Sequence, residues 1–196
     1  MLKEITVKNQ RVLDLFQRTE QYDHSQGLSL RYRNCTADNH LECGERATSE
    51  QYLQDLIAQR DPGNIQHSVN FIFGETPAAA EFFKEIKEVV NYDQYYTSGY
   101  VPHGFVGWHS DGDVEGWYIM ITYCTGSQGF FRYKDGDSIV TLNDQPGWAV
   151  RTVELKKDYD NMFWHCALSQ VPRYTFLMSF NDYDKFLVAT EALENQ

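Results

Sequence analysis

The first half of the chain carries apolar residues at helical spacing. Behind Ser49, a residue type that caps helices, the apolar residues of 52–57 fall on one helical face, and Asp61-Pro62-Gly63 would end this helix. The pair Thr76-Pro77 combines a cap with a proline at the first helical position, and the apolar stripe behind it reaches Val90. The pattern therefore predicts two amphipathic helices in this half.

Three further segments of this half are less periodic. Residues 69–73, Val-Asn-Phe-Ile-Phe, are typical of a buried strand, and residues 12–16 are typical of a short helix. Residues 23–47 are polar and irregular, which indicates a surface loop.

From Tyr95 onward the pattern changes to short runs rich in β-branched and aromatic residues, separated by turn residues. Asp135-Gly136 is a hairpin signal, and Asn143-Asp144-Gln145-Pro146-Gly147 is a turn. Many short strands joined by turns are typical of a sandwich or jelly roll, with the preceding helices packed on one face. The predicted strands span residues 118–123, 130–133, 139–142, 148–155 and 174–180.

We therefore expect a mainly β fold with N-terminal helices and a core that is a sandwich or a jelly roll. At 196 residues the chain has the usual length of one domain and can bury a core without disulfides. Within a single domain of residues 1–196, residues 1–91 would form helical support and a loop, and residues 92–182 the jelly-roll core. Residues 183–196 are acidic and are expected to form a solvated tail.

Charge and hydropathy narrow the range of partners. Lysine and arginine together number 17 and aspartate and glutamate 28, so the formal net charge is −11. This charge argues against nucleic-acid backbones and anionic membranes as partners, and no run of Lys or Arg offers a local basic groove. No apolar stretch of about 18 residues predicts a transmembrane helix, and the N-terminal residues lack the apolar core of a signal peptide. We therefore expect a cytoplasmic protein.

The four cysteines are then expected to be reduced thiols, although Cys35, Cys43, Cys124 and Cys166 could pair in three ways. The spacing of Cys35, His40 and Cys43 also hints at zinc. A structural zinc site needs four ligands, however, and only three are present.

The candidate chemistry lies in the β-rich half. His109-Ser110-Asp111 falls on a predicted strand, where residues two apart project from the same face, so the imidazole and the carboxylate would point together. His165, from a distant strand, would complete a set of two histidines and one carboxylate. This set leaves coordination positions open and is the usual site of non-heme Fe(II) oxygenases.

A second polar feature opens the last core strand. On residues 173–180, Arg173 and Thr175 share one face, and the bulky side chains at the even-numbered positions share the other. A guanidinium is a planar fork suited to bidentate pairing with a carboxylate, and a threonine hydroxyl adds a donor. The pair therefore predicts a carboxylate clamp.

With these residues the sequence resembles the Fe(II)/2-oxoglutarate-dependent dioxygenases, in particular the prolyl-hydroxylase-like branch. The family pattern is His-x-Asp, then a distal His, then an Arg or Lys on the last core strand. Here it reads Gly107-Trp108-His109-Ser110-Asp111, then Trp164-His165, then Arg173-Tyr174-Thr175. The strand at 118–123, followed by a glycine-containing aromatic stretch, is also similar to the family, and the resemblance covers residues 95–182.

The resemblance implies a double-stranded β-helix as the form of the jelly roll. It also implies Fe(II) as the cofactor, with 2-oxoglutarate and O₂ as co-substrates. The implied reaction decarboxylates 2-oxoglutarate to succinate and CO₂ and hydroxylates a substrate. In residue terms, it implies His109, Asp111 and His165 as metal ligands and catalytic residues, and Arg173, Thr175 and Tyr100 as residues that bind 2-oxoglutarate.

Individual residues of the motifs bear on the expected reaction and substrate. A carboxylate at Asp111 favours hydroxylation, because halogenating relatives have Gly or Ala at the matching position. Two departures from the branch weaken a prolyl substrate. Gln128-Gly129 stands where the branch usually has Gly-Gly, and Arg173 stands where many members have Lys.

Several functions stay open for this sequence. A peptide or protein side chain is the first choice of substrate from the branch resemblance, with a nucleobase and a small metabolite as alternatives. A non-catalytic, metal-binding jelly-roll module is a rival, although a relic site is expected to have lost one of its four key residues. A cupin-type metalloenzyme without 2-oxoglutarate is a second rival, and in such an enzyme Arg173 would be dispensable.

Overall fold

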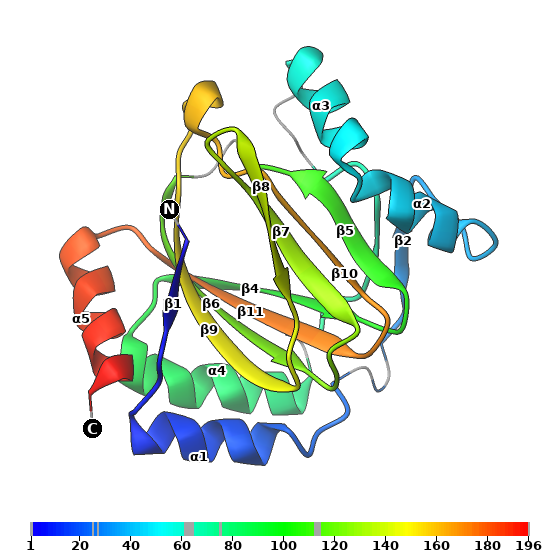
Figure 1. Cartoon of the computed structure of the whole chain (residues 1–196). Helices are drawn as coiled ribbons and strands as arrows, with labels where there is room; N and C mark the ends of the chain where they lie inside the picture. Colours follow the sequence, from blue (N-terminus) through cyan, green and yellow to red (C-terminus); the bar gives the residue numbers. More distant parts are fainter. Residues whose placement is uncertain are drawn as a thin grey trace.

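The computed structural model describes residues 2–24, 26, 28–60, 65–74, 76–111 and 115–195. These residues form two antiparallel sheets (Figure 1). The five-stranded sheet consists, in spatial order, of β1 (Lys3–Ile5), β9 (Gly147–Leu155), β6 (Gly116–Cys124), β11 (Arg173–Phe180) and β4 (Gln94–Tyr100). The six-stranded sheet consists of β2 (Arg31–Arg33), β3 (Ser68–Asn70), β5 (Gly104–His109), β10 (His165–Ser169), β7 (Gly129–Asp135) and β8 (Ser138–Asn143).

The order of strands along the chain is that of a jelly roll. From β4 to β11 the chain passes back and forth between the two sheets, and only the β7–β8 hairpin stays within one of them. The turn of that hairpin contains Gly136, whose φ of 57° suits the predicted turn. The predicted fold class, mainly β with N-terminal helices and a jelly-roll core, is confirmed.

Helices cover the outer sides of both sheets. α1 (Gln10–Thr19) and α4 (Pro77–Val90) lie side by side under the five-stranded sheet, and α5 (Tyr183–Glu194) lies beside its edge strand β1 (Figure 1). α2 (His40–Ala47) and α3 (Glu50–Ala58) lie next to β5, and the short η1 (Tyr159–Asn161) precedes β10. No helix of the described residues is long and apolar enough to span a membrane.

The helix α4 shows how sequence determines this arrangement. Thr76 Oγ1 accepts a hydrogen bond from the N–H of Ala79, and Pro77 occupies the first helical position, as predicted. The buried face of α4 packs on β11, where the ring centroids of Phe82 and Phe176 lie 4.2 Å apart. Burial of these aromatic residues fixes the helix to the outer face of the sheet.

The helix behind Ser49 is also confirmed, because Ser49 Oγ accepts a hydrogen bond from the N–H of Tyr52 at the start of α3. Its predicted stop at 61–63 lies outside the described residues. The predicted strand at 69–73 is shorter than expected. β3 ends at Asn70, and Phe71 makes only an isolated bridge to Gly99.

Two segments differ from the sequence predictions. The expected surface loop at 23–47 contains β2 and the helix α2, whose Cys43 and Ala47 are buried beside β5. The expected solvated tail at 183–196 forms helix α5, capped by Asp182. In both cases a few buried apolar residues at helical spacing are enough for a helix, although charged neighbours dominate the composition.

Candidate metal centre and carboxylate site

Two histidines meet where β5 and β10 pair. His109 and His165 are directly opposite each other in the register, and their ring centroids lie 4.1 Å apart. Next to them the register shifts, because Gly107 and Trp108 of β5 stand opposite the single residue Cys166. Such a bulge re-aims neighbouring side chains and is common beside active sites.

Gly107 has a packing role at this bulge. A Cβ at this position would lie 2.9 Å from the Cβ of Ala47 in α2, closer than real Cβ contacts allow. The helix therefore approaches the bulged strand closely only because residue 107 is glycine.

Asp111 joins the two histidines, but not for the predicted reason. β5 ends at His109, so Asp111 does not lie on the strand, and its φ of 48° is in the left-handed region. The chain turns there, and strand alternation no longer decides where the side chain points. The Asp111 carboxylate oxygens lie 3.7 Å from Nε2 of His109 and 3.8 Å from Nε2 of His165.

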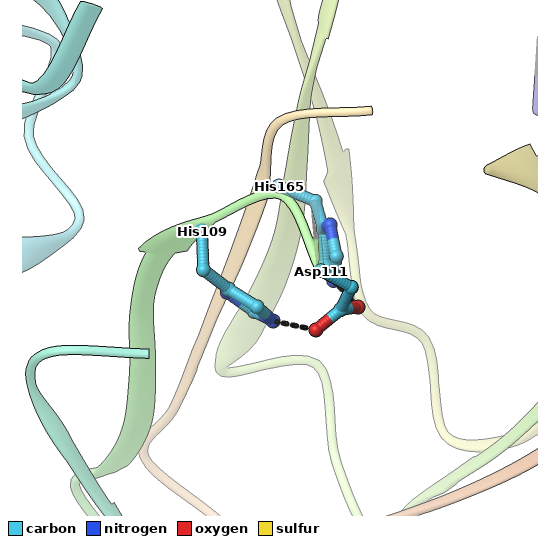
Figure 2. Close-up of side chains that lie close together, drawn as sticks. All are labelled: His109, Asp111 and His165. Atoms are coloured by element: carbon cyan, nitrogen blue, oxygen red, sulfur yellow. Dashed lines mark ion pairs between the residues drawn. The ribbon is translucent and has the colours of Figure 1, made fainter. Parts of the chain in front are cut away.

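The three side chains converge on one point (Figure 2). One ligand atom from each of the three lies within 4.8 Å of the others. Nδ1 of His109 lies 2.8 Å from the carbonyl oxygen of Gly107, and Nδ1 of His165 lies 2.9 Å from that of Phe163. A carbonyl can only accept a hydrogen bond, so each Nδ1 carries the hydrogen and each Nε2 lone pair is left for a metal.

Electrostatics favour the ligating form of His165. Burial lowers its pKa to about 4, the neighbouring His109 lowers it as well, and Asp111 opposes this effect. The imidazole is therefore neutral at physiological pH, as a metal ligand must be. Two imidazoles and one carboxylate offer nitrogen and oxygen donors that suit Fe(II), so the residues fit this metal.

A cavity of about 330 Å³ lies between the sheets, and the triad forms part of its wall. Tyr100, Arg173 and Thr175 line the same cavity. The six residues singled out from the sequence thus come together. The remaining wall is largely apolar and includes Val106, Tyr118, Met120, Phe131, Val153 and Leu177.

Arg173 is buried to 1% exposure at this cavity. Its Nε donates to Asp144 Oδ2 at 3.2 Å, its Nη1 donates to Thr175 Oγ1 at 2.8 Å, and the guanidinium lies 5.2 Å from the Tyr100 ring centroid. Burial opposes the charge, but Asp144, together with Tyr100 and Cys124, outweighs this effect, so the pKa of Arg173 is raised. Nη2 has no hydrogen-bond partner within the described part of the chain. A carboxylate in the cavity would satisfy this buried donor.

Asp144 is the residue of this site that the sequence analysis misses. It belongs to the predicted turn at 143–147, yet it is buried and its carboxylate pairs with Arg173. Gly129 makes room for it, because a Cβ there would lie 2.6 Å from Asp144 Oδ2. An aspartate in a turn is so common that the sequence offers no signal for this role.

The hint of zinc at Cys35, His40 and Cys43 is not supported. Across the described ranges, His109, Asp111 and His165 are the only such group of three candidate metal ligands. His40 instead contacts the carbonyl oxygen of Ala37 through Nδ1. The four cysteines are free thiols.

Comparison with solved structures finds similar folds at low identity. A prolyl hydroxylase from Trichoplax adhaerens, solved with a hypoxia inducible factor peptide fragment, has a TM-score of 0.41 and 13% identity, over 93% of this chain and 97% of that one. A prolyl-4-hydroxylase from Pseudomonas putida has a TM-score of 0.37 and 12% identity, over 85% and 96%. The Escherichia coli ribosomal oxygenase YcfD has 0.38 and 14%, over 64% and 35%. No protein-family model and no curated protein matches the chain.

Proposed function

We propose that the chain is an Fe(II)- and 2-oxoglutarate-dependent dioxygenase that hydroxylates its substrate. One observation carries the proposal. A single cavity is lined both by a His-Asp-His triad with free Nε2 atoms and by a buried arginine with an unpartnered donor. Metal ligands alone fit many proteins, and so does a buried arginine. Their combination fits a metal-binding 2-oxo acid that carries a second carboxylate.

In this proposal His109, Asp111 and His165 hold the iron. The bound iron, 2-oxoglutarate and O₂ supply the oxidising chemistry, in which one oxygen atom enters succinate, the other enters the substrate, and CO₂ is released. The Nδ1 hydrogen bonds to the Gly107 and Phe163 carbonyls keep both imidazoles oriented.

The protein also positions the co-substrate and excludes water. Nη2 of Arg173 donates to the distal carboxylate, with Thr175 beside it. Tyr100 lines the same end of the cavity and lies against the guanidinium of Arg173. The apolar wall keeps water from the reacting groups, which protects reactive species and strengthens electrostatic interactions.

A peptide or protein side chain is the substrate class that we propose. Ile72 and Tyr96 line the cavity and are 39% and 49% exposed, so they offer an apolar and aromatic surface at its mouth. An uncharged side chain suits the apolar wall. Small metabolites are the second class, and the net charge of −11 counts against nucleic acid. The four free thiols fit a reducing compartment, and we propose the cytoplasm.

The test is succinate formation. Protein loaded with Fe(II) under anaerobic conditions receives 2-oxoglutarate and then O₂, and succinate is measured with and without candidate peptides. We expect turnover in the wild type and none in His109→Ala. Arg173→Ala addresses the cupin-type alternative, because activity that survives this substitution does not depend on the carboxylate clamp. Calorimetry that finds no binding of Fe(II) or 2-oxoglutarate would overturn the proposal in favour of a binding module.

A further inference from the structure

A second arginine is buried on the inner face of the five-stranded sheet. Arg151 of β9 is 6% exposed and shares its face of the strand with Val153, which lines the cavity. Its Nε lies 3.8 Å from Glu4 Oε2, but the Glu4 side chain is 67% exposed, so water screens this contact. Nε and Nη1 of Arg151 are both buried, and neither has a hydrogen-bond partner among the described residues.

The strand register connects Arg151 to the carboxylate clamp. β9 pairs with β6, and β6 pairs with β11. Thr122 of β6 lies opposite Thr175 of β11. Arg151 of β9 lies opposite Met120, which is two residues from Thr122 and therefore on the same face of β6. Thr122 Oγ1 is also buried and has no partner in the described part of the chain. With Nη2 of Arg173 and the two Arg151 nitrogens, these are buried groups that can donate a hydrogen bond but lack a partner among the described residues. Leaving such groups unpaired in the interior destabilises the protein, and a bound anion would relieve this cost.

The charges show the same imbalance. Arg173 and Asp144 form a buried pair that is neutral as a whole, so a carboxylate placed on Arg173 would add an uncompensated negative charge. Both members of this pair act electrostatically on the pKa of Arg151. Burial lowers its pKa and Arg173 lowers it further, while Glu4 and Asp144 raise it. Arginine nevertheless stays charged.

Outside the metal triad, the other titratable groups described in this region are neutral or exposed. Burial raises the pKa of Cys124 to about 12, and it also raises the pKa of Tyr100 and of Tyr133. None of the three therefore carries a charge at neutral pH. Glu4 is exposed to water. Among the described residues outside the metal triad, two buried cations thus face one buried anion in this region, which leaves one positive charge for a ligand.

We propose that Arg151 is a positioning residue of the carboxylate subsite. Its charge balances Asp144, so that Arg173 can accept the distal carboxylate of a dicarboxylic 2-oxo acid. This inference rests on the proposed function, and it makes the subsite selective for a 2-oxo acid with two carboxylates over one with a single carboxylate.

The test is calorimetry on protein loaded with Mn(II), which takes the same nitrogen and oxygen ligands without oxidation. The ligands are 2-oxoglutarate and 2-oxopentanoate, which has the same carbon chain but no distal carboxylate. We expect Arg151→Met to weaken 2-oxoglutarate binding about tenfold or more and to leave 2-oxopentanoate binding unchanged. Arg151→Lys should keep most of the affinity. Arg11→Met, the same change on an exposed residue of α1, should have no effect.

A rescue variant separates charge balance from packing. In Arg151→Met combined with Asp144→Asn, the uncompensated anion is also removed, and affinity for 2-oxoglutarate should return towards that of the wild type. A packing defect would not be repaired in this way. If the methionine variant does not fold, Arg151→Gln gives the same test, because it also removes the charge but keeps a polar side chain.

Three results would overturn the inference. Arg151→Met could bind 2-oxoglutarate as the wild type does, it could lose affinity for both oxo acids equally, or the double variant could show no rescue. Wild-type protein that binds Mn(II) but neither oxo acid would instead overturn the proposed function, and the inference with it.

Discussion

The two faces of β11 differ in how completely the groups on them are satisfied. On the outer face Phe176 is fully buried, and its ring contacts those of Phe73, Phe82 and Phe83. On the inner face Arg173 is buried to 1% exposure, yet Nη2 has no partner among the described residues. The outer face is complete without a ligand, whereas the inner face keeps a costly unpaired donor. Stability and binding are thus assigned to opposite sides of one strand.

The largest loss of activity is expected when a residue of the triad, in the cavity between the two sheets, is replaced. His109→Ala removes one of three metal ligands, and we expect Fe(II)-dependent succinate formation to fall by more than about 100-fold, since even partners outside the ligand set cost 10–100-fold. The measurement is succinate formation at saturating Fe(II). His103→Asn, an exposed histidine replaced by a residue that tolerates its positive φ, is the control and should retain activity.

On the outer face we expect the opposite result, which is a loss of stability without a loss of ligand affinity. Phe176→Ala should lower the free energy of unfolding by about 3–5 kcal/mol, because it removes a fully buried ring and leaves a cavity. Denaturant unfolding measures this loss, and 2-oxoglutarate affinity of the folded fraction should be unchanged. A large loss of affinity with little loss of stability would break the division between the two faces.

A smaller effect is expected at Gly129. In Gly129→Ala the new methyl group would meet Asp144 Oδ2 at 2.6 Å and Ser169 Oγ at 2.9 Å, so the carboxylate that pairs with Arg173 must shift from its position. We expect 2-oxoglutarate binding to weaken about tenfold, with Mn(II) binding unchanged. Calorimetry with both ligands checks this, and equal weakening of both would show that the change is not confined to the carboxylate clamp.

The smallest expected effect is on the pH dependence of the free energy of unfolding, and it arises from a histidine on the outer face. His24 is buried against Phe73, Tyr174 and Phe176, and burial lowers its pKa below 6.5 despite the nearby Thr19 carbonyl. The folded state therefore binds fewer protons than the unfolded state. The resulting contribution to stability is present above pH 6.5 and is lost as the pH falls below it.

His24→Phe should accordingly make the free energy of unfolding less dependent on pH. Urea unfolding of the wild type and the variant at pH 7.5 and 5.5 measures the difference. An identical pH dependence in the two proteins would contradict the prediction.

The sequence predicts the outer layer and the identity of the candidate site residues better than their geometry. The two faces of β11 can be predicted from the sequence because side chains in a strand alternate with a period of two. All four bulky residues at its even positions are buried on the outer face of the sheet, beneath the helices. The arrangement of the triad is not readable in the same way. It depends on the bulge at Gly107-Trp108 and on the positive φ of Asp111, and neither leaves a periodic signal.

The acidic partner of the clamp and the second arginine show a further limit. Asp144 looks like a turn residue, and Arg151 looks like one polar position in a strand. The ion pair with Arg173 reveals the place of Asp144, and the pairing of β9, β6 and β11 reveals that of Arg151. Such long-range proximity depends on which strands pair and in which register, and neither can be read directly from a single sequence.

The central claim is that one cavity holds the metal and the co-substrate together. The most direct test is to measure the affinity of the wild type for 2-oxoglutarate with and without Mn(II). Because one molecule would contact both the metal and Arg173, the account predicts that Mn(II) tightens 2-oxoglutarate binding, and that 2-oxoglutarate tightens Mn(II) binding by the same factor. Affinities that do not depend on each other would contradict it.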